Sequence, residues 1–279
     1  MPDLKLSSQL AYAREHLDNG LADQAVQVCR RILETFPQCV EAYIVLGQAL
    51  LALDKPARAA DLLRRAWSAC PANPSASLGM AFVAERQGQV ALAQAWRKRA
   101  AEMEGRAQAI EDLASASLTR PALCYAWLRQ GIHDRAAREL TALIAENPPR
   151  YDLQVTLAQA LWQSGDEQEA AQLSQQILES HPYCLVALLI AGAFWLHTEH
   201  DKQARDWLAS AQALDPENAA AQTLLGAASP LPPRSARLPF RETDAPPLDL
   251  PYDEDEQDLA DDDWPEGDAF SPFAGYSTS

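Results

Sequence analysis

Residues 165–182 read Gly165-Asp-Glu-Gln-Glu-Ala170-Ala-Gln-Leu-Ser-Gln-Gln-Ile-Leu-Glu-Ser-His-Pro182. Glycine accepts the positive φ of a tight turn between helices, whereas proline cannot continue a helix, so the two residues mark the ends of one helix. A small residue such as Ala170 lets a second helix approach closely. The segment therefore predicts the second helix of a helix–turn–helix pair.

The same signals recur along the chain at a spacing of 34 residues. The closing prolines are Pro37 and Pro71, and then Pro148, Pro182 and Pro216. Twelve residues before them stand Ala25, Ala59, Ala136, Ala170 and Ala204. Turn glycines stand seventeen residues before three of them, at Gly20, Gly131 and Gly165. A further copy fits between Pro71 and Pro148, with Gly88 at the turn, Ala93 as the contact and Gly105 at the close.

Six phased copies of this pattern resemble the tetratricopeptide repeat family, whose 34-residue unit reads W-x-x-L-G-x-x-Y and then A, F and P. Matching residues include Tyr43, Leu46 and Gly47 in the second copy, and Leu188 and Gly192 in the sixth. Most of the family's first-helix aromatic positions hold aliphatic or small residues here. The resemblance covers about residues 6–216 and implies an all-α fold, a right-handed α-solenoid of helix pairs.

The phasing of the repeats predicts how the chain is divided. Residues 6–107 form a first block of three repeats, and residues 117–228 form a second block of three repeats plus a capping helix. The extra residues 108–116 contain no proline or glycine, so we expect a helical insertion there. Thr119 is expected to cap the next helix, with Pro121 in its first turn.

From Ser229 onward the composition changes to an acidic, proline-rich tail. Residues 229–279 contain thirteen acids and three arginines, while the whole chain has a formal net charge of -16. Such a segment buries too little apolar area to offset its ordering entropy, so we expect disorder over 229–279. Aromatic residues beside prolines are candidate binding motifs, or else hydrophobic residues scattered in a linker: Phe240, Tyr252, Trp264 and Phe273.

The family resemblance implies that the first helices of successive repeats line a concave groove that binds an extended or helical peptide. Transferring the family's groove positions gives Arg14, Gln48, Leu51, Phe82, Arg86, Tyr125, Arg129, Gln159, Trp162 and Leu189. The alternative is that some of these side chains contact neighbouring helices instead. Family members that grip a carboxylate terminus use Lys and Asn at these positions. Those residues are absent here, so that function is not carried over.

Chemistry-bearing motifs are scarce. We find no phosphate-binding glycine loop and no nucleophile elbow, so we expect no enzyme activity and no cofactor. His197 and His200 lack convincing further ligands, so no metal site is predicted. Five widely spaced cysteines favour a reducing compartment. We find neither a signal peptide nor a long apolar run, which predicts a cytoplasmic protein with no membrane contact. The acidity disfavours nucleic acid as a partner.

These observations predict a non-catalytic adaptor that binds a protein or peptide ligand in its groove. One alternative is a chaperone-like or anti-association protein that acts through its acidic tail, and a remote one is an enzyme with an unrecognised site. A further hypothesis joins the two parts of the chain. The tail's aromatic and acidic residues complement the apolar groove with its arginines, so one hypothesis is that the tail competes for its own groove. The alternative is a tail that stays solvated and binds elsewhere.

Overall fold

A computed structural model describes residues 4–105, 118–146, 150–196 and 201–239. Over these residues the chain forms thirteen α-helices, and consecutive helices pack against each other in pairs. They are α1 (Leu6–Asp18), α2 (Ala22–Thr35), α3 (Val40–Ala52), α4 (Pro56–Ala69), α5 (Pro74–Arg86), α6 (Val90–Glu104), α7 (Arg120–Arg129), α8 (His133–Glu146), α9 (Tyr151–Ser164), α10 (Glu167–Ser180), α11 (Leu185–Trp195), α12 (Asp201–Leu214) and α13 (Ala219–Leu225). The predicted all-α repeat array is confirmed.

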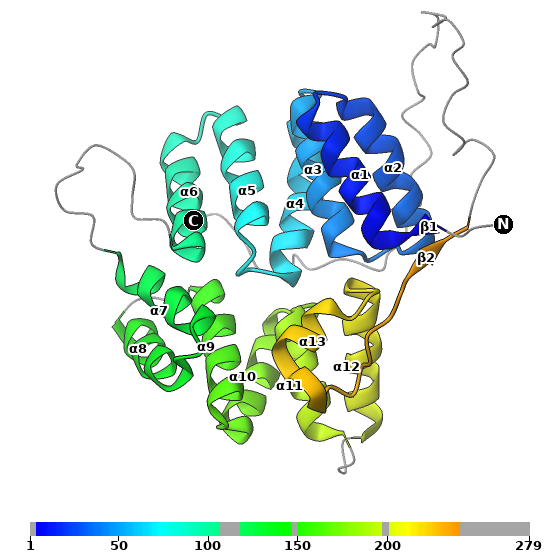
Figure 1. Cartoon of the computed structure of the whole chain (residues 1–279). Coiled ribbons are helices and arrows are strands. Elements are labelled where there is room, and N and C mark those ends of the chain that lie inside the picture. Colours follow the sequence, from blue (N-terminus) through cyan, green and yellow to red (C-terminus); the bar gives the residue numbers. More distant parts are fainter. Residues whose placement is uncertain (1–3, 106–117, 147–149, 197–200, 240–279) are drawn as a thin grey trace, which may run out of the picture.

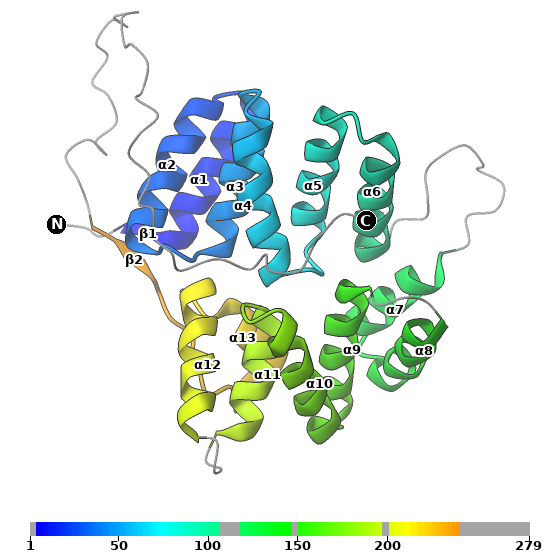
Figure 2. The same ribbon diagram turned by 180° about the vertical axis from the view of Figure 1, so that it is seen from behind.

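The helices lie in two rows, one above the other. Helices α1–α6 form the upper row in Figure 1, here called the first block, and α7–α13 form the lower row, the second block. The rows run in opposite directions, so α12 and α13 return beneath α1–α4 (Figures 1 and 2). The chain is thus folded back on itself rather than extended as one continuous superhelix.

Close helix packing within the first block depends on a leucine that fits between two glycines. Leu63 of α4 lies against Gly47 of α3 and Gly79 of α5, and a Cβ at either glycine would stand 2.6 Å or less from a Leu63 side-chain carbon. Leu208 of α12 lies against Gly192 of α11 in the same way. The missing side chains let three helix backbones approach around one buried leucine.

Turns between paired helices follow the predicted chemistry. Gly20, Gly88, Gly131 and Gly165 all have positive φ. In the second repeat Asp54 takes the same conformation, with φ 58°, at a position where glycine is the usual residue. Thr119 caps α7 by accepting the Ala122 amide at 3.4 Å, as expected.

The first block ends at α6 because its outer face is not built to receive another repeat. At one position of the second helix, successive repeats carry Cys29, Leu63 and then Arg97. The cysteine and the leucine are fully buried, whereas Arg97 forms an ion pair with Glu85 instead. A polar outer face is what terminates a repeat array. The predicted helical insertion 108–116 lies outside the described residues.

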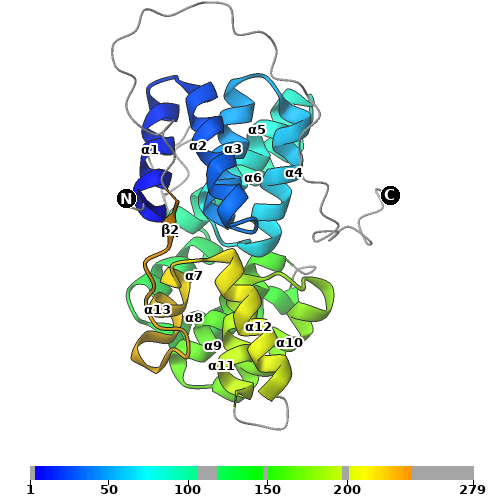
Figure 3. The same ribbon diagram turned by 90° about the vertical axis from the view of Figure 1, so that its right-hand side faces the viewer.

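After the short 3-10 helix Gly226–Ala228, residues 229–239 form an ordered strap that returns to the N-terminus (Figure 3). Within it β2 (Arg237–Leu238) pairs antiparallel with β1 (Leu4–Lys5). Ala236 and Leu238 are 2% and 1% exposed, and the Leu6 amide donates to the Ala236 carbonyl at 2.9 Å. The expectation of disorder from Ser229 is therefore wrong for residues 229–239.

The second block holds the start of the strap through side-chain amides. Asn218 donates from Nδ2 to the Pro232 carbonyl at 2.8 Å, and Gln222 donates from Nε2 to the Leu231 carbonyl at 2.6 Å. The strap thereby ties the last helix of the second block to the first helix of the first. None of the helices in the described ranges combines the length and the apolar character needed to cross a bilayer.

Candidate functional site

The first helices of successive repeats form the more crowded side of each block. In the first block α1 contacts α3 and α3 contacts α5, and in the second block α9 contacts both α7 and α11. Helices brought closer together on one side make that side the inner, concave one. The predicted groove positions belong to these first helices, so their surroundings decide which of them a partner can reach.

In the second block the first-helix side faces the first block. Tyr151 of α9 packs edge-to-face against Trp67 of α4 at 5.4 Å between ring centroids. Its hydroxyl donates to the Ser68 carbonyl at 2.8 Å. The Tyr151 ring also packs edge-to-face against the His181 ring, at 3.7 Å between ring centroids, and burial lowers the pKa of that imidazole. The last turn of α4 is therefore anchored to α9.

A cavity of about 440 Å³ lies at this seam. The turn Cys70–Pro74 of the first block lines one side, and residues of α9, α11 and α13 line the other. Two predicted groove residues, Gln159 and Leu189, are among them. The concave side of the second block is thus partly occupied by this chain's own turn, and the remaining space is mostly apolar.

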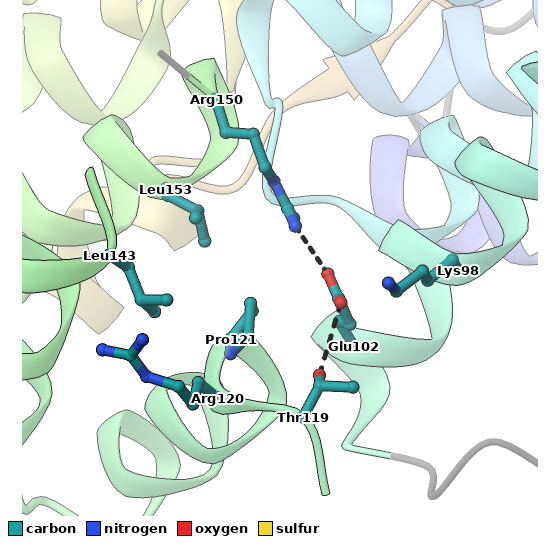
Figure 4. A pocket seen from close by; sticks show the side chains of 8 residues that line it. All are labelled: Lys98, Glu102, Thr119, Arg120, Pro121, Leu143, Arg150 and Leu153. Atoms are coloured by element: carbon teal, nitrogen blue, oxygen red, sulfur yellow. Dashed lines mark hydrogen bonds and ion pairs between the residues drawn. The ribbon is translucent and has the colours of Figure 1, made fainter. Parts of the chain in front are cut away.

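A polar network joins the two blocks beside α6 (Figure 4). Arg150 donates from Nη1 to Glu102 at 2.8 Å and from Nη2 to Asp152 at 2.5 Å. Tyr125 donates to Asp152 at 3.2 Å, and Thr119 donates to Glu102 at 3.3 Å. Both carboxylates are buried, at 4% exposure for Glu102 and 0% for Asp152. These charges are therefore paired and hydrogen-bonded on several sides, as buried charges must be, and they join α6 of the first block to the residues around α7 and α9.

Beside this network a second cavity, of about 410 Å³, is lined by residues of both blocks. Lys98 of α6 and Arg120 of α7 stand at its edge, with Pro121, Leu143 and Leu153 among its apolar lining (Figure 4). Arg120 is bound to Glu139 and Glu146, each at 2.5 Å, and the hydrogen bond from Arg120 lowers the pKa of Glu146. The charged groups around this cavity are mainly paired with one another.

The first-helix side of the first block carries three of the four predicted residues that are exposed, and the fourth, Arg129, lies at the end of α7. Phe82 of α5 is 50% exposed, and Arg97 lies over its ring at 5.7 Å. Arg14 of α1 pairs with Glu41, and Arg86 of α5 pairs with Asp54. Together with the half-buried Gln48 of α3 these side chains come from three successive first helices. This group is the candidate binding face.

Other predicted positions serve helix packing. Leu51, Tyr125 and Leu189 are buried, and Trp162 is half-buried. Arg129 donates from Nη1 to the Met103 carbonyl at 2.6 Å and so closes the end of α6. A ligand role for these residues stays a prediction. The candidate tail motifs at Phe240, Tyr252, Trp264 and Phe273 lie outside the described residues.

Two further findings bear on chemistry. In the described part of the chain there is no group of three or more His, Cys, Asp or Glu side chains placed to hold a metal ion. Burial raises the pKa of the Cys29 thiol to about 12 and that of Cys39 to about 11. At neutral pH these thiols are protonated and therefore poor nucleophiles. The candidate histidines His197 and His200 lie outside the described residues.

Comparison with known proteins identifies the repeats. A family model described as the tetratricopeptide repeat matches residues 10–74, and a second with the same description matches residues 128–182. No curated protein matches the chain. A solved structure of pilF from Pseudomonas aeruginosa is 16% identical, with a TM-score of 0.33, and covers 75% of this chain and 91% of that chain. The structure of YrrB, titled a TPR protein with an unusual peptide-binding site, is 17% identical, with a TM-score of 0.31, and covers 68% of this chain and 93% of that chain.

Proposed function

This chain belongs to the tetratricopeptide repeat family, and we propose that it is a non-catalytic adaptor whose first block binds a segment of a partner protein. Repeats of this family are protein-interaction modules. The binding face is the first-helix side of α1, α3 and α5, which carries Arg14, Gln48, Phe82 and Arg86. The segment that it accepts is an extended or helical peptide.

The observation that carries the proposal is the exposure of Phe82. Phe82 is a large aromatic side chain that is half exposed on the first helix α5, so it leaves apolar area for a partner to cover. The equivalent side of the second block is partly filled by the Cys70–Pro74 turn, which leaves the first block as the accessible site. Aromatic residues are also the commonest centres of binding energy in protein interfaces.

The neighbouring ion pairs define the chemistry of the ligand. Arg86 and Arg97 are exposed, and each is paired with a carboxylate of this chain, Asp54 or Glu85. An acidic residue of the ligand can take the place of such a surface carboxylate at little cost, because exposed ion pairs are weak. The preferred ligand therefore combines an apolar anchor for Phe82 with an acidic residue beside it.

The test is selection of peptides from a displayed random library on the full-length protein, followed by calorimetric titration of the best binders. Phe82→Ala should weaken binding about tenfold or more, which corresponds to the loss of an interface hot spot. Leu92→Ala is the matched control, because Leu92 is similarly exposed but lies on the second helix α6. The proposal fails if Phe82→Ala binds as wild type, or if Leu92→Ala is equally damaging.

The acidic tail is also predicted to contact the first-helix side of α1, α3 and α5, because its sequence complements that face. This contact stays a prediction. The tail beyond Pro239 lies outside the described residues. Addition of a peptide with the sequence 240–279 to the titrations described above tests it directly, since a groove-bound tail competes with the selected ligand. Unchanged ligand affinity at millimolar tail peptide would contradict it.

A further inference from the structure

A pair of adjacent basic residues recurs at the 34-residue spacing of the repeats, in the second helix of each repeat of the first block. Arg30-Arg31, Arg64-Arg65 and Lys98-Arg99 are separated by 34 residues and occupy the same position on α2, α4 and α6. Identical positions in stacked repeats form a row across the array. The row therefore lies on the second helices of the first block, whereas Phe82 lies on the first helix α5. We call these six residues the basic row.

The basic row belongs to the first block alone. The corresponding pairs in the second block are Thr141-Ala142, Gln175-Gln176 and Ala209-Ser210. Helices α2, α4 and α6 together carry eight basic and five acidic residues, whereas α8, α10 and α12 carry four basic and eight acidic residues. In a chain of net charge -16, this is a local reversal of sign.

Side chains of the row are exposed or half-buried, and the contacts of Arg64 and Arg99 lie at the surface. Arg64 pairs with Asp61 at 2.5 Å, both residues being well exposed. Arg99 lies over the Trp96 ring at 4.7 Å, and Lys98 is exposed. Exposed ion pairs of this kind exchange partners readily, because each contributes little to stability. A second anionic segment can therefore join or replace the local partners.

The strap ends next to the basic row. Arg31 donates from Nη2 to the carbonyl of Pro239 at 2.5 Å, so the last described residue of the strap touches the first step of the row. The forty residues that follow, 240–279, contain thirteen acids and one basic residue, Arg241. The most acidic part of the protein therefore begins in contact with its most basic surface.

We propose that the basic row is an intramolecular docking surface for the acidic segment 240–263 of the same chain. Helices in contact lie about 10 Å apart, and second helices of successive repeats lie farther apart, so the row spans on the order of 25 Å. An extended chain covers about 3.4 Å per residue, so the segment up to Asp249 is long enough to run along the whole row. The acids at 253–256 and 261–263 supply further partners for a chain that folds back along it.

Tethering makes this contact effective although each ion pair is weak. A segment tethered at the edge of its site experiences an effective concentration near millimolar. At that concentration an intrinsic Kd of about 0.1 mM keeps roughly nine-tenths of the molecules docked. An anionic partner of the row must then displace the tail.

The test compares ¹⁵N-labelled full-length protein with the isolated peptide 240–279. At about 0.05 M salt the amide signals of residues 240–263 should differ from those of the free peptide. At about 1 M salt, where the Debye length is about 3 Å, they should move to the free-peptide positions. The row variant replaces one basic residue per repeat, by Arg30→Gln, Arg64→Gln and Lys98→Gln. In this variant the amide signals of residues 240–263 should take the free-peptide positions already at low salt.

A matched control removes the same number of charges elsewhere. Arg14→Gln, Arg86→Gln and Arg205→Gln alter the first-helix side of the first block and an exposed position of α12. This variant should leave the tail signals displaced from the free peptide as in the wild type. Release of the tail by the control instead of the row variant would place the contact on the groove side and overturn the proposal.

Two further outcomes decide the matter. Tail signals that match the free peptide at low salt in the wild-type protein overturn the proposal outright. If the row variant does not fold, the complementary changes are made in the tail, beyond the described residues. The tail variant combines Asp253→Asn, Glu254→Gln, Asp255→Asn and Glu256→Gln. In this variant the amide signals of residues 257–263 should shift towards the free-peptide positions. Signals unchanged by these substitutions also contradict the proposal.

Discussion

Replacing Arg150 with methionine tests whether the polar network at the seam holds the two blocks together. Arg150 is the only basic residue, among those in the described ranges, that the structure shows bonded to both Glu102 and Asp152. Both carboxylates are buried, so Arg150→Met leaves two negative charges with fewer partners in a poorly solvated site. Breaking a buried pair by removing one partner costs about 3–5 kcal/mol, which is a large part of the stability of a typical domain.

The assay is urea denaturation of the full-length protein, followed by far-UV circular dichroism and by tryptophan fluorescence. Trp67 reports on the seam because its ring packs against Tyr151. We expect a fall in the unfolding free energy of about 3–5 kcal/mol. We also expect the two probes to separate, because the blocks lose their shared contact and unfold in different steps.

A matched control is Arg120→Met. Arg120 also binds two carboxylates, but both of these lie nearer the surface, so its loss should be far less destabilising. The triple change Arg150→Met, Glu102→Gln and Asp152→Asn should recover most of the lost stability, since it removes the unpaired charges as well. An Arg150→Met protein that unfolds within about 1 kcal/mol of wild type would refute the reasoning.

Three further predictions follow from other contacts. Leu238→Ala should lower the free energy of unfolding by about 2–4 kcal/mol and speed proteolysis of the strap, because Leu238 is buried against the first block. The control is Arg237→Ala, since Arg237 is exposed. Equal effects of the two substitutions would contradict the packing role. Gly79→Ala should lower the free energy of thermal unfolding by about 1–3 kcal/mol, since the new Cβ would stand 2.5 Å from the Leu63 side chain. Leu63→Val should reduce that penalty. An unchanged melting temperature of Gly79→Ala would show that α4 and α5 do not pack this closely. Burial lowers the pKa of His181 below its usual 6.5, so the folded state favours the neutral imidazole, and stability declines as pH falls through about 6.5 towards the lower pKa of the folded state. In His181→Gln the free energy of unfolding should depend less on pH over this window. Identical pH profiles for the variant and the wild type would contradict this.

Much of the architecture was predictable because the signals that encode it are local and repeat. Proline, glycine and alanine at a fixed phase specify where each helix ends, how tightly it turns and where its partner approaches. Pro182 and Gly165, for example, act within one helical turn of their own position, so no knowledge of the tertiary structure is needed to interpret them. The groove positions Arg14, Phe82 and Arg86 came from the family resemblance, since phasing alone does not tell which face of a helix a partner contacts.

Composition was a poorer guide where a segment depends on distant partners. The strap is rich in proline and looks unstructured, yet Leu238 is buried because it meets Leu4 from the other end of the chain. Pairing between residues so far apart is set by the way the second block returns beneath the first. A local pattern carries no information about such an encounter.

The sequence by itself determined the helical repeats, their ends and the row of basic pairs, since each follows from a spacing of 34 residues. Only the tertiary structure decided which concave face is accessible. The Cys70–Pro74 turn lies against α9 and α11, so Gln159 and Leu189 face this chain instead of open solvent. The two blocks also meet through the ion pair of Arg150 with Glu102 and through the pairing of the strap with β1. These contacts join residues of different repeats whose partners no periodic signal identifies.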